Sequence, residues 1–484
     1  MRILPLILLT SLAACSTQSS VSAQNHVDEK PIIFTANSGQ STDAFEGSFV
    51  VPENRLNPQS RDLTLRYVRF AATGTRKGNP IVYLAGGPGG SGIATAKYWR
   101  FPFFLAMREF GDVIALDQRG TGASNDMETC TSSHIVDGTQ QVSDGEFAKI
   151  NQRALQECMS IWQGQNIDLR GYTTVQNVGD LEALRVHLGA DKINLWGISY
   201  GSHMALAAIK QIPDSLERIV IASAEGLDQT IKQPARTDAY FGRLQLAINS
   251  QPDAQAQFPD IRAMMHRVHA NLDKAPLRIQ IPQKNGEAVG YVLQRRDMQQ
   301  IASAMISDPS RAGQLLQIYS QLDQGNWAPV AGLLQRFYTP GEGVSFSPMS
   351  VMTDIASGIG AERRTMIEKQ AETSLLGVYL NDTLGLVDVD PSYDLGDGFR
   401  EKPVSDVPLL LLSGSLDGRT YVESQHEAVS GLHNAQKVLV TNAGHNLFML
   451  SATEVRPGVL DAISDFMQGQ NVDGREVAVD LPDF

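Results

Sequence analysis

Short apolar runs that end in glycine-rich turns recur through the first half of the chain. Residues 80–90, 112–122, 191–199 and 217–226 each contain such a run. Parallel strands covered by helices on both faces have this continuous apolar character, because neither face of the strand meets water. The pattern therefore predicts a buried, mostly parallel sheet.

Alternating and helical segments lie before and between these runs. Apolar and polar residues alternate over 45–55 and 62–72 closely enough to predict an opening pair of strands. Residues 177–189 place apolar side chains at helical spacing and end on a glycine, and residues 202–212 have helix-forming composition. Strands that alternate with helices are typical of an α/β fold.

The alternation stops in the middle of the chain and then returns. Residues 226–400 are mostly helical in character with irregular glycine and proline links, whereas strands are predicted again over 406–418 and 437–446. We therefore expect one α/β domain interrupted by a large helical cap. The expected divisions are a lipoprotein-type signal segment over 1–15, a flexible tether and lead-in over 16–44, core over 45–225, cap over 226–400 and core over 401–484.

The first fifteen residues are typical of an export signal. Arg2 precedes an apolar run over 3–12, which is too short to span a bilayer, and small residues then lead to Cys15. The last four residues of this segment resemble a bacterial lipobox, and the alternative is an ordinary signal cleaved near Ala14. We expect Cys15 to be lipidated and the chain to lie in the bacterial envelope, anchored by that lipid and facing the periplasm.

The two other cysteines, Cys130 and Cys158, favour a disulfide, because an exported compartment is oxidising. Their spacing excludes a C-x-x-C redox motif, and no histidine cluster supports a zinc site. The net charge of −13 argues against a nucleic-acid partner, which needs clustered Lys and Arg.

Ser199 lies between Gly197 and Gly201, where a predicted strand passes into a predicted helix. The G-x-S-x-G pattern in this context is typical of a nucleophile elbow, although the pattern alone also fits a serine in a glycine-rich loop. A serine hydroxyl is a weak nucleophile until a general base takes its proton, and an acid must orient that base.

His445 and Asp417 are the candidate base and acid. Each follows a predicted late strand, and the order serine, acid, histidine is that of α/β-hydrolases. Asp228 is the rival acid. Four further histidines lie in predicted helices, where a surface or core role is expected: His266, His269, His426 and His433.

The glycine-rich segment 85–92 is the candidate oxyanion loop. Its glycines allow the backbone to approach a substrate closely, so we expect the N–H of Gly87, or else of Gly86, to act with the N–H of Tyr200. A phosphate-binding loop is the alternative, but the segment lacks both the Lys-Ser/Thr pair of a P-loop and G-x-G-x-x-G spacing.

Five segments, taken in order, resemble the motifs of proline iminopeptidase-type serine peptidases, in particular an exported branch with a tripeptidyl-aminopeptidase-like C-terminal part. They are GGPGGSG (86–92), LDQRGTGAS (116–124), WGISYGS (196–202), GSLDG (414–418) and NAGHN (442–446). The resemblance implies an α/β-hydrolase fold with a helical cap, Ser199, Asp417 and His445 as the triad, and hydrolysis at the amino terminus of short peptides. The cysteine pair fits this branch. Ala85 stands where the cytosolic members usually carry histidine, which argues against strict proline specificity.

An aminopeptidase must bind the free ammonium of its substrate, and a partly dry pocket requires a carboxylate for this. Glu225, after a buried strand, and Asp354, in the cap, are the candidates. The expected function is therefore a serine aminopeptidase acting through an acyl-enzyme on short peptides, with no metal or organic cofactor. A carboxylesterase or other acyl hydrolase is the alternative, and a non-catalytic binding lipoprotein is a third hypothesis.

Overall fold

The computed structural model describes residues 28–75, 78–124, 127–283, 286–450 and 457–484. Cys15, the expected signal over 1–15 and the first part of the expected tether lie outside these residues. Within the described part of the chain, no helix is long and apolar enough to cross a membrane.

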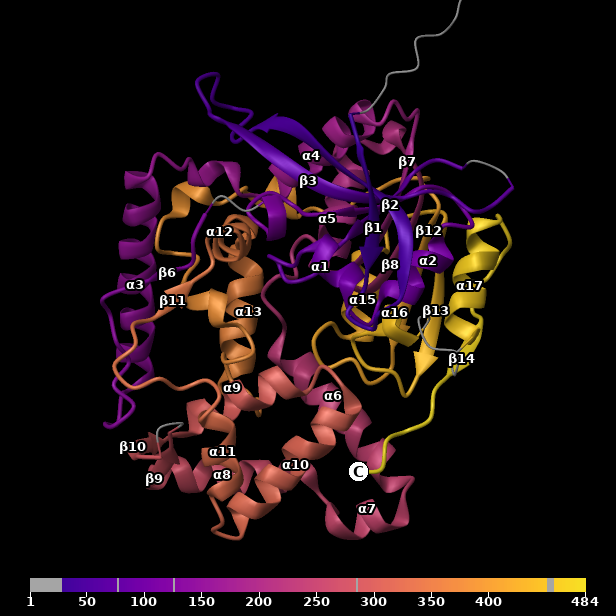
Figure 1. Ribbon diagram of the computed structural model, residues 1–484. Coiled ribbons are helices and arrows are strands. Elements are labelled where there is room, and N and C mark those ends of the chain that lie inside the picture. The colour runs from indigo at the N-terminus through magenta and orange to yellow at the C-terminus, as the bar shows by residue number, and fades with distance from the viewer. Residues whose placement is uncertain (1–27, 76–77, 125–126, 284–285, 451–456) are drawn as a thin grey trace, which may run out of the picture.

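A ten-stranded sheet forms the centre of the molecule, in the order β1-β2-β3-β5-β4-β7-β8-β12-β13-β14 (Figure 1). Its strands are β1 (Lys30–Thr35), β2 (Ser41–Pro52), β3 (Asp62–Phe70), β4 (Ile81–Leu84), β5 (Val113–Leu116), β7 (Ile193–Ser199), β8 (Leu216–Ala224), β12 (Leu409–Gly414), β13 (Ala435–Thr441) and β14 (Glu476–Ala478).

Strands β1, β2, β3 and β5 pair antiparallel, and every pair from β5 to β14 is parallel. The predicted, mostly parallel α/β sheet is therefore confirmed. Strand β1 and the start of β2 fall inside the stretch 16–44 that was expected to be a lead-in, so the sheet begins earlier than the sequence pattern indicated. The short edge strand β14 was also not predicted.

The helices follow the strands in the α/β manner. They are α1 (Gly92–Lys97), α2 (Phe101–Met107), α3 (Asp144–Gly164), α4 (Thr174–His187), α5 (Tyr200–Gln211), α6 (Pro234–Asn249), α7 (Pro252–Gln257), α8 (Ile261–Lys274), α9 (Arg295–Met305), α10 (Pro309–Asp323), α11 (Ala328–Leu334), α12 (Pro348–Ser357), α13 (Ala361–Ala371), α14 (Asp397–Arg400), α15 (Val422–Ala428), α16 (Leu447–Leu450) and α17 (Pro457–Met467).

Both faces of the sheet are covered by helices. Apolar side chains of α4, α5 and α15 share one buried cluster with one face of the sheet, and those of α2, α16 and α17 share another cluster with the opposite face. In β7, Leu195 belongs to the first cluster, and Trp196 belongs to the second, where it packs against Phe103. This two-sided burial is why the parallel strands are apolar at nearly every position.

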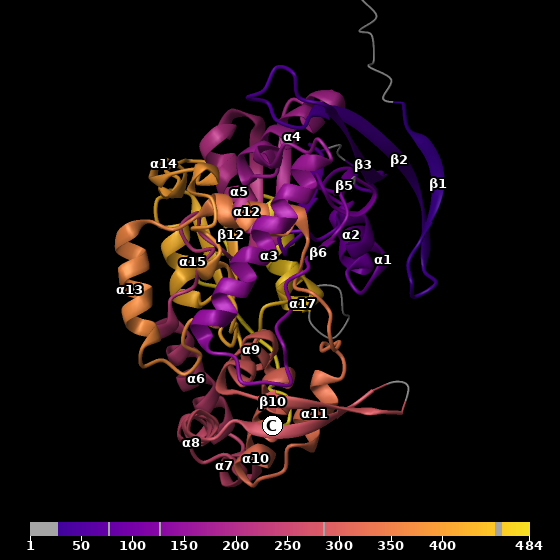
Figure 2. The ribbon, with the colours of Figure 1, turned by 90° about the vertical axis from the view of Figure 1, so that its left-hand side faces the viewer.

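Between β8 and β12 the chain leaves the sheet and builds a cap with an apolar core of its own. Figures 1 and 2 show helices α6 to α11 of this cap gathered below the sheet. The cap also holds a hairpin, β9 (Leu277–Pro282) with β10 (Ala288–Leu293), which the sequence analysis did not anticipate. Ile279 and Ile281 alternate with exposed residues in β9 and bury into the cap core, which is the period-two signal of a strand.

A segment of the first half of the chain lies against the cap. Strand β6 (Cys130–Thr131) pairs antiparallel with β11 (Ser345–Phe346), which comes just before α12. The expected disulfide joins Cys130 to Cys158 of α3. The bridge therefore ties α3 to the pair of strands that leads into α12.

We expect loss of this disulfide to destabilise the protein. The bridge closes a loop with a sequence separation of 28, and the chain-entropy model then gives about 3–4 kcal/mol of stability. Urea unfolding of the Cys130→Ser, Cys158→Ser double variant measures this loss. Reduced wild-type protein is the control and should match the variant. Alkylation of both thiols in native protein without prior reduction would contradict the pairing.

Candidate active site

Ser199 lies at the carboxyl end of β7, directly before α5. Its backbone has φ 55° and ψ −126°, a conformation that non-glycine residues seldom adopt. Such strain persists only where the surrounding structure enforces it, and it is common at reactive residues. The turn therefore has the geometry of a nucleophile elbow.

The two flanking glycines are required by close backbone contacts. A Cβ atom on Gly197 would lie 2.5 Å from the carbonyl oxygen of Gly201, and one on Gly201 would lie 2.1 Å from the carbonyl oxygen of Leu84. Any larger residue at either position would push β7, α5 and β4 apart. The spacing of the G-x-S-x-G pattern is thus explained by packing at the turn.

His445 follows β13, and its imidazole contacts the carboxylate of Asp417 after β12. The Nδ1 atom lies 3.1 Å and 3.0 Å from the two carboxylate oxygens. The backbone of His445 is held from two sides. Its N–H donates to the carbonyl of Ser307 in the cap at 2.8 Å, and its carbonyl accepts from the Ser223 hydroxyl at 2.6 Å. The histidine is therefore oriented by both the core and the cap.

Asp417 is fully buried, yet it is held as a carboxylate. The backbone N–H groups of Arg419 and Thr420 donate to it at 2.8 and 2.9 Å, and the Thr420 hydroxyl donates at 2.7 Å. Burial raises the pKa of Asp417, but His445 and the hydrogen bonds from Thr420 outweigh burial and lower it overall. This arrangement suits an acid that must stay ionised beside a histidine.

The structure does not bring Asp228 to His445. The Asp228 carboxylate lies 3.7 Å from Arg363 instead. Other histidines also have separate surroundings: His269 bonds Tyr319 at 2.7 Å, and His433 contacts Asp406 at 2.9 Å on the surface.

The glycine-rich loop lies against the candidate nucleophile. A Cβ atom on Gly86 would come within 3.0 Å of the Ser199 Cβ. The N–H of Gly87 has no acceptor among the described residues, and the N–H of Tyr200 belongs to the first turn of α5, where helical N–H groups lack partners. Ser350 of α12 donates to the carbonyl of Pro88 at 2.8 Å and holds the loop from the cap side.

Ser199 opens into a cavity of about 280 Å³ between core and cap. The predicted amine-binding residues, Glu225 and Asp354, both line it. Nine of its twelve lining residues are polar or charged, so the cavity offers little apolar surface. The full set is Gly87, Pro88, Ser199, Glu225, Thr230, Lys232, Asp354, Leu380, Asn381, Thr383, Arg419 and Thr420.

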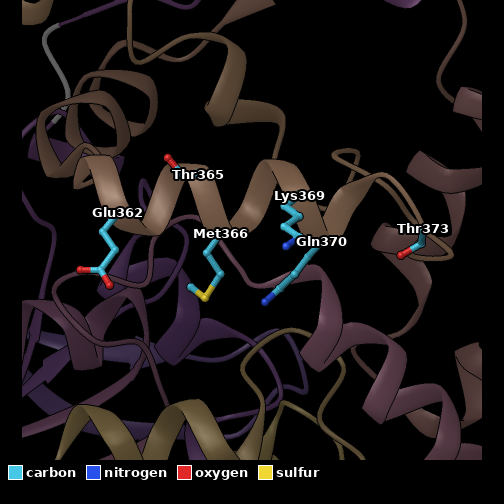
Figure 3. Close-up of a pocket in the computed structure, with 6 residues that line it drawn as sticks. All are labelled: Glu362, Thr365, Met366, Lys369, Gln370 and Thr373. Carbon is cyan, nitrogen blue, oxygen red and sulfur yellow. The ribbon is translucent and has the colours of Figure 1, made fainter.

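A second hollow, on α13, contains none of these groups. Figure 3 shows the side chains that line it, from Glu362 in α13 to Thr373 just after the helix, with Met366, Lys369 and Gln370 directed to the same side. No candidate nucleophile or base belongs to it, so it is separate from the site around Ser199.

Glu225 is already ion-paired inside the cavity. Its carboxylate contacts the ammonium of Lys232, which also donates to the carbonyl of Gln229 at 2.9 Å. Burial raises the pKa of Glu225, and Lys232 together with His203 outweighs it, so the carboxylate stays ionised.

Asp354 has no such cation at contact distance among the described residues. Burial, together with the nearby Glu225 carboxylate, raises its pKa to about 8. Two acids therefore share this cavity, one ionised and one protonated at neutral pH.

We expect Asp354 to make stability depend on pH. The folded protein keeps this proton up to about pH 8, whereas the unfolded chain releases it near its ordinary pKa of 3.8. The stability from the protonated group is therefore complete below about pH 4 and is lost progressively as pH rises from there through 8. Asp354→Asn cannot ionise, so its stability relative to wild type should improve from pH 5 to pH 9 in urea unfolding. Asp253→Asn, at an exposed position, is the control. An unchanged difference across this range would contradict the assignment.

A model of the alpha/beta hydrolase fold matches residues 79–452. The chain belongs to the α/β-hydrolase fold family. The match covers every segment that supplies Ser199, Asp417 and His445. Groups of three or more His, Cys, Asp or Glu residues that could hold a metal ion are absent from the described part of this hydrolase.

Several relatives of this α/β-hydrolase are named as proteases or peptidases. Serine protease Hip1 of Mycobacterium tuberculosis is 27% identical over 184 residues, 37% of this chain and 35% of the relative. Tripeptidyl aminopeptidase of Streptomyces coelicolor is 28% identical over 191 residues, 37% and 34%. A probable proline iminopeptidase of Leptolyngbya boryana is 27% identical over 150 residues, 31% and 33%. The hydrolase thus spans about a third of the length of each relative. Together with the family match, the names of these relatives support the serine hydrolase activity that is proposed below.

Among solved structures, a proline iminopeptidase-related protein from Thermus thermophilus is similar to this hydrolase. It has 17% sequence identity and a TM-score of 0.38, and the alignment covers 88% of this chain and 97% of that chain.

Sequence reasoning missed two charged residues of the hydrolase site, Lys232 and Arg419. Arg419 stands two residues after Asp417, so the loop that supplies the acid was a signal that could have drawn attention to it. Lys232 lies in an irregular stretch between β8 and α6, where nothing in the local pattern indicates that it turns back to Glu225.

Proposed function

We propose that this protein is a serine hydrolase, and that it acts as an exopeptidase that releases residues from the amino terminus of short peptides, with Ser199, His445 and Asp417 as its triad. The observation that carries the proposal is that two acidic side chains, Glu225 and Asp354, line the same cavity as the strained serine. A peptide ammonium lies only one residue from the first scissile carbonyl. An acid pair close to the nucleophile suits a substrate with a free amino terminus. The names of the relatives agree with peptide hydrolysis.

In this proposal, the Ser199 hydroxyl attacks the scissile carbonyl carbon and gives its proton to Nε2 of His445. Asp417 holds the opposite nitrogen, Nδ1, and stabilises the imidazolium that forms. The N–H groups of Gly87 and Tyr200 donate to the oxyanion of the tetrahedral intermediate. Nε2 then protonates the leaving amine as the C–N bond breaks, which leaves an acyl-enzyme. A water molecule then attacks the acyl carbonyl with the same proton transfers through His445, and cleavage of the ester bond releases Ser199.

The ammonium of the substrate would lie between Glu225 and Asp354. Asp354 must give up its proton to serve as a partner, and an ammonium beside it favours the ionised form. Glu225 would keep its contact with Lys232 while sharing its charge with the substrate. The amine is thus recognised by a pair of acids.

We expect N-acetylation of a good peptide amide to lower kcat/KM by the equivalent of about 2–4 kcal/mol, because it removes a charge that the acid pair would bind. Asp354→Asn and Glu225→Gln should each raise KM for the free-amine substrate and barely change hydrolysis of a simple ester. Matched free and acetylated fluorogenic amides measure the effect. Equal turnover of blocked and free amides would contradict the exopeptidase proposal and favour an esterase or another acyl hydrolase.

We further propose that the hydrolase is exported and held at the bacterial envelope, facing the periplasm, by a lipid on Cys15. The lipobox-like end of the segment over 1–15 supports this. Wild-type cells should incorporate labelled fatty acid into the protein, and a Cys15→Ser variant should not. Equal labelling of both would refute the anchor.

A further inference from the structure

We propose that Arg419 and Lys232 form a subsite for a carboxylate carried by the substrate, so that the enzyme prefers peptides with a carboxylate close to the free amino terminus. The inference rests on the proposed exopeptidase function and adds to it a substrate class. Both cations line the cavity that also holds Ser199, and neither belongs to the triad or to the acid pair.

The guanidinium of Arg419 is held at one of its three nitrogens. Its Nη1 atom donates to the hydroxyl and carbonyl oxygens of Ser303 on α9, at 2.8 and 3.2 Å. No carboxylate among the described residues lies within ion-pair distance of the guanidinium, and no described acceptor contacts its Nε or Nη2. A guanidinium presents its donors in a rigid, planar fork that matches a carboxylate. The cap thus binds Nη1 of a residue that lines the cavity, and Nε and Nη2 are without acceptors among the described residues.

Lys232 is held in place by hydrogen bonds to its backbone and to its ammonium. Asn381 accepts from the Lys232 N–H at 2.5 Å and donates to the Lys232 carbonyl at 2.7 Å. The side chain is 11% exposed, and its ammonium bonds Glu225 and the carbonyl of Gln229. Placing an ammonium in such a mostly enclosed position has a desolvation cost that its surroundings must offset. A substrate carboxylate close to the Lys232 ammonium would be its second anionic partner, beside Glu225.

The charge balance of the cavity leaves room for one anion. Its charged lining side chains are two acids, Glu225 and Asp354, and two cations, Lys232 and Arg419. When a substrate ammonium joins them, three cations face two acids even with both acids ionised. Because an unpaired charge in a partly dry site is costly, a carboxylate on the same substrate completes the balance.

The size and lining of the cavity restrict where that carboxylate is carried. A volume of about 280 Å³ is at the small end for ligand sites, and its lining offers no apolar recess for a bulky side chain. The carboxylate would therefore belong either to an acidic side chain of the released residue or to the carboxyl terminus of a very short peptide.

Fluorogenic amides of Glu and Gln, assayed with the full-length enzyme, test the side-chain source, because the two differ in charge but hardly in shape. We expect kcat/KM for the Glu amide to exceed that for the Gln amide by on the order of tenfold or more. A dipeptide and its C-terminal amide test the terminal source in the same way. A preference for the charged member in either pair supports the carboxylate subsite. Ratios near one in both pairs overturn it.

Variants assign the preference to the two cations. Arg419→Gln should bring the charged-to-neutral ratio close to one, Lys232→Gln should lower it, and Arg419→Lys should keep part of it. Arg267→Gln is the matched control, because Arg267 pairs with Asp323 on the surface and should leave the ratio unchanged. An unchanged ratio in Arg419→Gln overturns the assignment of this subsite. Hydrolysis of esters with no turnover of any free-amine amide would instead reject the exopeptidase proposal, which is a separate result.

Discussion

Ser199→Ala is expected to lower kcat by about 10³-fold or more, because it removes the hydroxyl of the strained residue between β7 and α5 that is the proposed nucleophile. The fold should remain, since the change removes one oxygen atom and leaves Gly197 and Gly201 in place. Turnover of the best substrate, together with the thermal unfolding midpoint, measures both effects. A fluorophosphonate should label wild-type protein on Ser199 and leave the variant unlabelled.

Ser430→Ala is the control for this experiment. Ser430 is exposed, and its hydroxyl donates to the carbonyl of Glu427, so activity and labelling should match wild type. Comparable turnover by Ser199→Ala would show that the elbow is not the nucleophile. It would also remove the basis for the acyl-enzyme, whatever the substrate.

Asp417→Asn is expected to lower kcat by up to about 10⁴-fold. An amide in place of the carboxylate cannot stabilise the imidazolium of His445, and it can present an N–H to Nδ1 and so favour the wrong tautomer of the ring. The backbone N–H groups of Arg419 and Thr420 would still have the amide oxygen as acceptor, so the loop should keep its shape. The pH profile of kcat/KM and the unfolding midpoint separate loss of chemistry from loss of fold.

Asp228→Asn is the matched control, because Asp228 was the rival acid and instead contacts Arg363. It should reduce kcat far less than Asp417→Asn does. Equal losses in the two variants, or a larger loss in Asp228→Asn, would contradict the assignment of the acid to the loop after β12.

Local sequence determined the buried strands, the tight turn at Ser199 and the loops that supply His445 and Asp417. Continuous apolar runs indicated that β4, β5, β7, β8 and β12 are buried on both faces, because a parallel strand between two layers of helices has no polar face. The glycines at 197 and 201 indicated a turn that is too tight for a Cβ atom. The loops that supply His445 and Asp417 could be recognised because each directly follows a strand, and parallel strands bring their carboxyl ends to one edge of the sheet.

Weak or unusual local signals were missed. The alternation in strand β1 was outweighed by polar neighbours, and that in the β9–β10 hairpin was outweighed by the helical character of the cap.

Only the tertiary structure decided which charged groups meet at the site. Glu225 and Asp354 could each be proposed from the sequence, but their shared cavity depends on tertiary structure, which brings α12 to the residue that follows β8. Hydrophobic periodicity does not indicate that Lys232 contacts Glu225 or that Arg419 lines the cavity. Both side chains lie in loops, and their positions depend on packing between segments far apart in the sequence. Sequence patterns record whether a residue is buried. They do not record which side chains share the buried space, and that sharing sets the charge of this site.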